Sequence, residues 1–470
     1  MNPAATFVCT ALSFVAAATV PAVAGSLMPD TAAGRCAAAF LAAFNADDED
    51  SMRAFEEQYR AKSALERRSI DDRLTMVRDL RAKWGSLELQ RVISGDERNL
   101  DLLVRAGRTD QLYCLGFELE QQPPHGLLGI RIEGPIDIER GAALSQPLEP
   151  SIRQRVVDRA ADELIRAYVF EDIARQMAED LHRRLGAGEY EEITTAHEFA
   201  RRLTEDLRAI SHDRHLAVRP RAATLPEHGP EAPPGARDLP GRGNYGFEKV
   251  EILAGNVGYI KLNGFAGGTE GHPTAAAAMA FVAHTDALIF DLRENGGGSP
   301  DMIMFLSGYL FDEPVHLNSF HNRSEGTVQD FYSAAEVPGP RYGPRKPVYV
   351  LTSAYTFSGA EEFTYNLKNL NRATIVGRTT GGGAHPVQFY TINKQFEMTV
   401  PYARAVNPIT KTNWEGTGVT PDVDVPADQA LDTAHDLALK AVQPGEQPPT
   451  VPTPGVPAPA EPSPTAPASS

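Results

Sequence analysis

The sequence contains little cysteine and little positive charge. Its 470 residues include three Cys, 45 Lys plus Arg and 62 Asp plus Glu, which gives a formal net charge of −17. Proteins that bind a phosphate backbone usually carry the opposite balance, with a basic patch on one face. Nucleic acid is therefore not expected as a partner. The 42% apolar and 23% charged fractions exclude a collagen-like, coiled-coil or wholly disordered chain.

Long apolar runs are absent after the first two dozen residues. Residues 1–24 carry no charged side chain, are apolar over 7–20 and end in small residues at 22–24. This pattern predicts a signal peptide that is cleaved on export, and a retained membrane anchor is the alternative. We expect an exported protein, periplasmic or secreted, without stable membrane insertion after cleavage.

Two cysteines remain once the signal peptide is removed. Cys36 and Cys114 either form a disulfide in an oxidising compartment or stay as two buried thiols, and the sequence leaves both possibilities open. Neither cysteine belongs to a CxxC pair, so redox chemistry and a zinc ribbon are not indicated.

Composition and periodicity divide the rest of the chain. We expect an α+β domain of unknown role at 30–145, a helical segment at 150–218, a Pro/Gly-rich linker at 219–244 and an α/β domain at 245–442. In residues 444–470, 10 of 27 are Pro, which predicts a disordered tail at 443–470.

The two folded domains differ in how strands and helices follow one another. In the first domain, helical periodicity gives way to four strand-like runs, at 87–93, 100–104, 112–119 and 127–132. In the last domain strands and helices alternate. The expected strands are 257–262, 287–292, 348–351 and 373–376, and the expected helices are 273–284, 299–310 and 358–370. Alternation predicts a mainly parallel sheet, with any site at the carboxyl ends of its strands.

Ser358 stands between an expected strand and an expected helix. Backbone N–H groups and the helix dipole favour negative charge there, which suits a nucleophile. The alternative is structural, because Ser358-x-x-Glu361 is also a capping box. Glycines at 296–298 let backbone amides approach a substrate and donate to an oxyanion. They match no nucleotide-binding motif, and a plain turn is the alternative.

A hydroxyl nucleophile needs a neutral base, and histidine is the usual one. The candidates are His212, His215 and His385. His212 and His215 are three residues apart, but no third ligand follows at metal spacing and no H-E-x-x-H motif exists. The sequence therefore predicts no metal and no organic cofactor.

Taken together, four ordered segments resemble the tail-specific (C-terminal processing) serine peptidase family. They are Asp291-Leu292-Arg293-x-Asn295-x-Gly297-Gly298, the Ser358 turn before Glu361, Gly377-x-Thr379-x-Gly381, and Gly418-Val419-x-Pro421-Asp422. The resemblance extends over about 151–428. The lysine of serine–lysine members is missing at 381–385, and no PDZ domain fits between His215 and the α/β domain. The chain is therefore more similar to the branch that contains the tricorn protease core and interphotoreceptor retinoid-binding protein.

This resemblance implies a fold, an activity and a set of roles. The fold is a crotonase/ClpP-like spiral, Ser358 attacks, His215 is the base and Glu415 completes the relay. The amides of Gly297 and Gly359 hold the oxyanion. Two alternatives stay open: His385 is the runner-up base or a substrate contact, and Glu415 is an exposed loop acid. A serine precedes the base in the tricorn pattern, whereas Arg214 stands here.

We therefore expect an exported serine peptidase that acts on polypeptides or peptides. The alternative is a non-catalytic carrier of an apolar ligand on the same fold, as the retinoid-binding relative suggests. The substrate, the cleavage specificity, the oligomeric state and the role of the first domain do not follow from the sequence.

Overall fold

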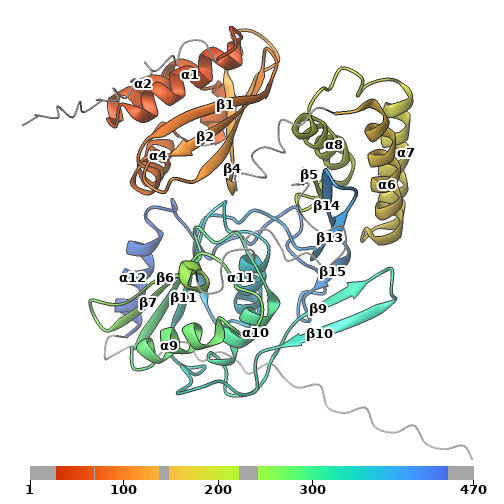
Figure 1. The fold of residues 1–470 in the computed structure, drawn as a ribbon. Coiled ribbons are helices and arrows are strands. Elements are labelled where there is room, and N and C mark those ends of the chain that lie inside the picture. The colour runs from red at the N-terminus through yellow and green to blue at the C-terminus, as the bar shows by residue number, and fades with distance from the viewer. Residues whose placement is uncertain (1–27, 68, 137–147, 222–241, 443–470) are drawn as a thin grey trace, which may run out of the picture. The chain divides into compact units, whose positions relative to one another are not determined.

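The structure is a computed structural model that describes residues 28–67, 69–136, 148–221 and 242–442 (Figure 1). The predicted signal peptide, most of the predicted linker and the predicted tail lie outside these ranges. Within the described residues, no helix combines the length and apolar character that a membrane span needs. The chain divides into two compact units. Of the described residues, 28–67, 69–136 and Thr195–Glu198 belong to the N-terminal unit, and the others belong to the C-terminal unit.

The N-terminal unit packs four helices against an antiparallel meander. The helices are α1 (Ala32–Asn45), α2 (Glu49–Tyr59), α3 (Lys62–Arg67) and α4 (Ile70–Trp84). The strands β1 (Leu87–Gly95), β2 (Asn99–Ala106), β3 (Leu112–Leu119) and β4 (Leu127–Ile136) pair in chain order. All four predicted strands are present. Cys36 and Cys114 are buried free thiols, and burial raises the pKa of Cys36 to about 12.

Three helices open the C-terminal part of the chain: α6 (Pro150–Ala167), α7 (Glu171–Gly186) and α8 (Ala196–Ser211). Gly188, at φ 76°, follows the end of α7, where a left-handed residue suits a helix C-terminus. Thr195 accepts a hydrogen bond from Glu198 N–H (3.3 Å) through its hydroxyl, as an N-cap residue does. Apolar residues at four-residue spacing on these helices, such as Val156, Ala160 and Leu164, are fully buried.

The C-terminal unit is built on a six-stranded mixed sheet in the order β16-β12-β11-β8-β7-β6. Its strands are β6 (Phe247–Leu253), β7 (Val257–Leu262), β8 (Ala287–Asp291), β11 (Val348–Thr352), β12 (Thr374–Gly377) and β16 (Val423–Asp424). Neighbours are parallel except for β6, which pairs antiparallel with β7. The mainly parallel sheet expected from the sequence is therefore present, with one antiparallel edge strand that the prediction lacked.

Helices cover both faces of this sheet (Figure 1). Residues such as Leu288, Phe290 and Val350 point into one core, together with α9 (His272–Val282), α10 (Pro300–Gly308) and α11 (Gly359–Asn369). The alternate residues, such as Ile289 and Leu351, point into a second core against α12 (Ala430–Ala441). Burial on both faces explains why β8 and β11 are continuous apolar runs.

Two three-stranded sheets complete the unit. One has the order β10-β9-β15, from β9 (His316–Asn322), β10 (Thr327–Tyr332) and β15 (Ala403–Val406). The other has the order β13-β14-β5, from β13 (Val387–Thr391), β14 (Phe396–Pro401) and β5 (Ala217–Pro220). The first two residues of the predicted linker therefore belong to a strand, because β5 pairs with β14.

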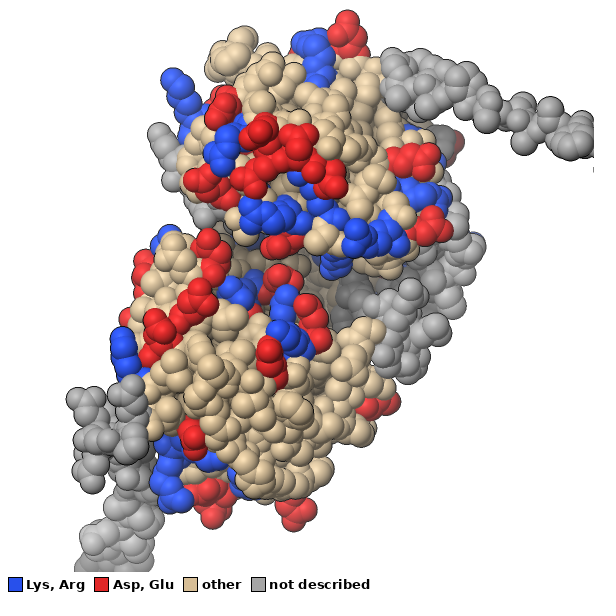
Figure 2. Space-filling model, turned by 90° about the vertical axis from the view of Figure 1, so that its left-hand side faces the viewer, with Lys and Arg blue, Asp and Glu red and all other residues tan. Residues whose placement is uncertain are grey.

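On the face shown in Figure 2, Lys and Arg side chains stand among Asp and Glu side chains. Charged groups of both signs are therefore mixed on this face.

Candidate active site

Loops at the carboxyl ends of the central strands meet at one edge of the main sheet. The loop after β11 is tied to the loop after β8, because Phe357 N–H donates to Asn295 O (3.1 Å). The Thr356 hydroxyl donates to Leu292 O (2.8 Å), and Gly381 N–H, after β12, donates to Thr356 O (2.9 Å). These bonds hold three predicted motifs together, as expected for an α/β sheet.

The Asp-Leu-Arg-x-Asn segment is a scaffold for these loops. Asp291 is buried and accepts from Arg293 Nη2 (2.6 Å) and from the Tyr259 hydroxyl (2.7 Å). Asn295, also buried, donates through Nδ2 to Leu262 O (2.9 Å). Because every polar group named here bonds within the protein, the segment fixes the backbone that follows it.

Ser358 has an unusual backbone conformation, with φ 53° and ψ −122°. An ordinary N-cap is extended. Ser299, before α10, has φ −84° and ψ 138°, and its hydroxyl accepts from Asp301 N–H (3.2 Å). Positive φ is uncommon in residues other than glycine, and such strain is concentrated at functional sites. The geometry therefore distinguishes Ser358 from a residue that only caps a helix.

Glu361 holds this strained turn in place. Its buried carboxylate accepts hydrogen bonds from Ser358 N–H (2.9 Å), Gly382 N–H (2.6 Å), Gly383 N–H (2.8 Å) and the Thr380 hydroxyl (2.5 Å). The bond from Ser358 N–H is the reciprocal half of the predicted capping box. Burial raises the pKa of Glu361, and the four donors oppose that rise. One carboxylate thus links Ser358 to the loop after β12.

Gly297 lies against Ser358, since a Cβ on this glycine would stand 2.7 Å from Ser358 Cβ. Its φ is 112°, which also favours glycine. The Gly297 N–H, predicted to hold an oxyanion, donates to Asn295 Oδ1 (2.8 Å). By contrast, the amides of Gly298 and Gly359 have no acceptor among the described residues. A Cβ on Gly359 would stand 3.0 Å from Gly298 N, so these two amides are close neighbours.

His215, whose side chain is 10% exposed, lies beside the residue that precedes Ser358. Its ring centroid is 4.7 Å from that of Phe357, and a Cβ on Gly383 would stand 2.7 Å from His215 Cε1. Neither ring nitrogen has a hydrogen-bond partner within the described part of the chain. Burial lowers the pKa of His215 to about 4, so the ring is neutral at neutral pH. Arg214 braces the same loop, because Nη1 donates to Gly381 O (2.6 Å).

His385 and Glu415 lie in one cluster with His215 and with Asp213, a residue that the sequence prediction did not assign. His385 Nδ1 is 3.0 Å from Asp213 Oδ2 and 3.5 Å from Glu415 Oε2. Burial raises the pKa of Glu415, whereas at Asp213 the interactions with His385 and His215 outweigh burial and lower the pKa. The Glu415 side chain is 20% exposed, so it is not a fully exposed loop acid.

The structure therefore brings His215, Glu415 and His385 together. Ser358 is linked to this cluster through its chain neighbour Phe357, whose ring contacts His215. His212 is exposed. One local signal could have identified Asp213. An Asp side chain often accepts the backbone N–H of the residue two positions later, and here His215 N–H donates to Asp213 Oδ1 (3.0 Å). Its contact with His385, 172 positions away, has no local signal.

Glu362, the neighbour of Glu361 on α11, is a buried acid away from this cluster. Burial raises its pKa to about 7, and the nearby Asn318 side chain opposes the rise. Between pH 4.5 and 7 the folded state keeps a proton that the unfolded state has lost. We expect the free energy of unfolding to fall by roughly 3 kcal/mol as the pH rises through this window.

Glu362→Gln should remove that dependence, because the amide is neutral at every pH. Urea unfolding at intervals from pH 4.5 to 7.5 measures it. Glu205→Gln, at an exposed carboxylate on α8, is the matched control and should keep the wild-type slope. An unchanged slope in Glu362→Gln would contradict the assignment.

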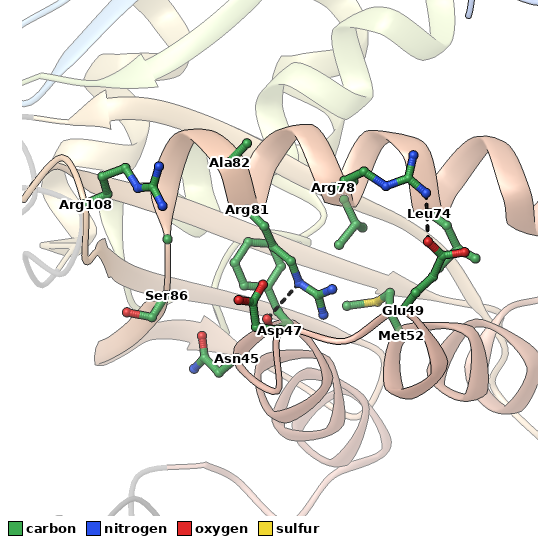
Figure 3. A pocket seen from close by; sticks show the side chains of 13 residues that line it. Asn45, Asp47, Glu49, Met52, Leu74, Arg78, Arg81, Ala82, Ser86 and Arg108 are labelled. Atoms are coloured by element: carbon green, nitrogen blue, oxygen red, sulfur yellow. Dashed lines mark hydrogen bonds and ion pairs between the residues drawn. The ribbon is translucent and has the colours of Figure 1, made fainter.

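The N-terminal unit has a pocket of about 580 Å³ between α1, α2 and α4 (Figure 3). Its charged side chains are engaged in packing. Arg78 pairs with Glu49 (2.7 Å), and Arg81 donates to Phe44 O (2.9 Å) and Ala43 O (2.6 Å) near the C-terminus of α1. No nucleophile and base meet among its lining residues, so this pocket is not the candidate active site.

Two family models match parts of this chain. Residues 256–425 match the model of peptidase family S41, and residues 150–241 match the N-terminal domain of peptidase S41 in eukaryotic interphotoreceptor retinoid-binding protein. The chain is 25% identical over 170 residues to carboxyl-terminal-processing peptidase 2, chloroplastic, of Arabidopsis thaliana, covering 36% of this chain and 32% of the relative.

It is also 27% identical over 156 residues to the tail-specific protease of Haemophilus influenzae, covering 32% of this chain and 21% of that protein. The matches thus span about a third or less of these relatives. Among solved structures, the photosystem II D1 C-terminal processing protease matches with a TM-score of 0.40 and 15% identity, over 62% of this chain and 97% of that chain.

Proposed function

The chain belongs to peptidase family S41, whose members are serine peptidases, and we propose that it hydrolyses peptide bonds with Ser358 as its nucleophile. The observation that carries the proposal is the strained backbone of Ser358 at the N-terminus of α11, beside two amides that lack acceptors among the described residues. A hydroxyl on such a turn can reach a substrate carbonyl while the amides face the oxygen.

In the proposed reaction His215 accepts the Ser358 proton, and Ser358 Oγ bonds to the peptide carbonyl carbon. The developing oxyanion accepts hydrogen bonds from Gly359 N–H, as predicted from the sequence, and from Gly298 N–H in place of Gly297 N–H. The tetrahedral intermediate collapses, the C–N bond breaks, and His215 gives its proton to the leaving amine. Water then attacks the acyl carbon while His215 takes one water proton, the bond from that carbon to Ser358 Oγ breaks, and His215 gives the proton to Oγ as the carboxylic acid product leaves. Each oxyanion donor should be worth about 3 kcal/mol.

Glu415 and Asp213 are proposed as positioning residues for the base. The carboxylates lie within 4.8 Å of a His215 ring nitrogen, and His385 hydrogen-bonds to Asp213. A carboxylate beside an imidazole stabilises the imidazolium that forms when the base takes a proton. His385 remains the alternative base, because its Nδ1 bonds to Asp213 Oδ2 (3.0 Å), as the base of a serine–histidine–aspartate triad bonds to its carboxylate. Its ring packs edge-on against Phe170.

Export, a polypeptide or peptide substrate and the crotonase/ClpP-like spiral remain parts of the proposal. Residues 1–24, on which export depends, are outside the described structure. The carrier of an apolar ligand stays the alternative, and the match of residues 150–241 to a domain of interphotoreceptor retinoid-binding protein favours it. Organic extraction of the purified protein tests it, and a released lipid-like ligand would support it.

A fluorophosphonate tests the nucleophile directly, because it phosphonylates activated serines. We expect one label per chain, on the peptide that contains Ser358, located by mass spectrometry. Ser299→Ala should label normally, because Ser299 has the geometry of an ordinary cap. Labelling at another serine, or none in a folded protein, would contradict the proposal.

A further inference from the structure

The cluster around His215 also has the composition of a metal site. Ligating atoms of Asp213, His215 and Glu415 all lie within 4.8 Å of one another. Asp213 Oδ1 is 3.9 Å from His215 Nδ1. The three side chains come from the loop after α8 and from the loop after β15, so no sequence spacing could show the set. This is why the sequence predicted no metal.

The three ligating atoms could hold a zinc ion if they moved slightly closer together. Zinc bonds to imidazole nitrogen and carboxylate oxygen are about 2.0–2.2 Å, so the ligands of a tetrahedral site are about 3.4 Å apart. The present separations exceed this by up to about 1.4 Å. The Glu415 side chain is 20% exposed, and its Oε2 accepts from Ala384 N–H (2.6 Å), so closure requires the carboxylate to turn about this bond or to bind through Oε1. Three protein ligands leave a fourth position for water.

A second observation points to a ligand independently of the acidic groups. The His215 side chain is nine-tenths buried, and both ring nitrogens lack a hydrogen-bond partner among the residues described. Buried polar atoms are nearly always partnered, since leaving one unpaired costs free energy. A cation among these atoms would provide the missing partner for one nitrogen.

His385 supports the ligand set without belonging to it. Its Nδ1 lies 3.0 Å from Asp213 Oδ2 and 3.5 Å from Glu415 Oε2, where it orients both carboxylates. Metal-binding carboxylates usually have such a hydrogen-bonded neighbour. The two nearest arginines are directed to main-chain oxygens: Arg208 donates to Leu216 O (2.8 Å) and Arg214 to Gly381 O.

We infer that Asp213, His215 and Glu415 bind a zinc ion that switches the peptidase off. The ion takes the lone pair of His215 that would otherwise accept the Ser358 proton. Inhibition of the peptidase by zinc therefore rests on the proposed function, whereas the binding of zinc to these three residues does not. Chelation restores the free imidazole, so the effect is reversible.

Calorimetric titration of the full chain with zinc, after removal of metal with EDTA, tests binding. We expect one zinc per chain. Asp213→Asn, His215→Ala and Glu415→Gln should each weaken binding by about 100-fold or more, and His385→Ala by about 10- to 100-fold. His435→Ala is the matched control, because that imidazole on α12 contacts Ala254 O (2.7 Å) and none of the ligands. No binding by the wild type, or equal binding by His215→Ala, would overturn the site.

Cobalt provides a readout that does not depend on any variant folding. Bound Co²⁺ should give the strong visible absorption of a four-coordinate ion, and zinc should displace it. A weak, six-coordinate spectrum would count against the site.

Hydrolysis of a peptide substrate at increasing zinc tests the switch. Half-inhibition should occur near the calorimetric Kd, and EDTA should restore the rate. Zinc that binds without slowing an active enzyme would overturn the switch. A metal-free enzyme that hydrolyses nothing would overturn the proposed function, while calorimetry would still decide the zinc site.

Discussion

Ser358→Ala should lower kcat for peptide hydrolysis by on the order of 10⁴-fold or more and leave the fold unchanged. The hydroxyl is the atom that bonds to the substrate carbonyl in the proposed mechanism, so nothing else in the site replaces it. The strained φ of 53° is set by the backbone bonds of Glu361, which alanine does not remove. Kinetics and urea unfolding of the purified variant measure the two effects.

Ser358→Gly separates activity from stability. Glycine adopts positive φ without the cost that a side chain pays there, so this variant should be more stable than Ser358→Ala by about 1 kcal/mol and equally inactive. Thr31→Ala is the control at an ordinary cap, since Thr31 is extended and accepts from Gly34 N–H (3.0 Å). It should lose about 1 kcal/mol of stability and keep full activity. Activity in folded Ser358→Ala would remove Ser358 as nucleophile.

His215→Ala should lower kcat by about 10³-fold or more, the second-largest effect expected. The ring is buried beside Phe357, and its nitrogens are without partners in the described residues, so a lone pair is available for the serine proton. Added imidazole should restore part of the rate, because a small base can enter the space that the side chain leaves. Steady-state kinetics with and without imidazole give the result.

His385→Ala is the comparison that decides between the two histidines. We expect a smaller loss and no rescue by imidazole, because His385 acts by orienting Asp213 and Glu415. His435→Ala should match the wild type. If His385→Ala lost more activity than His215→Ala, and imidazole rescued it, the base would have to be His385.

Many helices and strands could be predicted because the spacing of apolar residues in the sequence matches the side chains that are buried in the structure. The strand predicted at 257–262 is β7 with the same bounds, and the expected helix at 358–370 is α11 within a residue at each end. Strand β5 was missed, since its four residues are a strand only by pairing with β14, almost 180 positions later. Pairing over such a separation leaves no periodic signal in a short segment.

Site residues could be predicted where a reactive side chain stands at a recognisable position between a strand and a helix. Ser358 was expected from its place between a strand and a helix, and the positive φ adds a reason that the sequence does not contain. Gly297 was expected as an amide donor, but its N–H bonds to Asn295 Oδ1, which only the folded loop reveals. Asp213 and Glu415 were not recognised as neighbours, because their approach depends on how distant loops meet.

The most direct test of the central claim is to incubate the protein with a denatured protein mixture and to identify new peptide termini by mass spectrometry, with Ser358→Ala as the control. The account predicts new termini with the wild type alone, and their flanking residues would report the cleavage specificity. Equal sets of termini in the two samples would contradict a serine peptidase that uses Ser358.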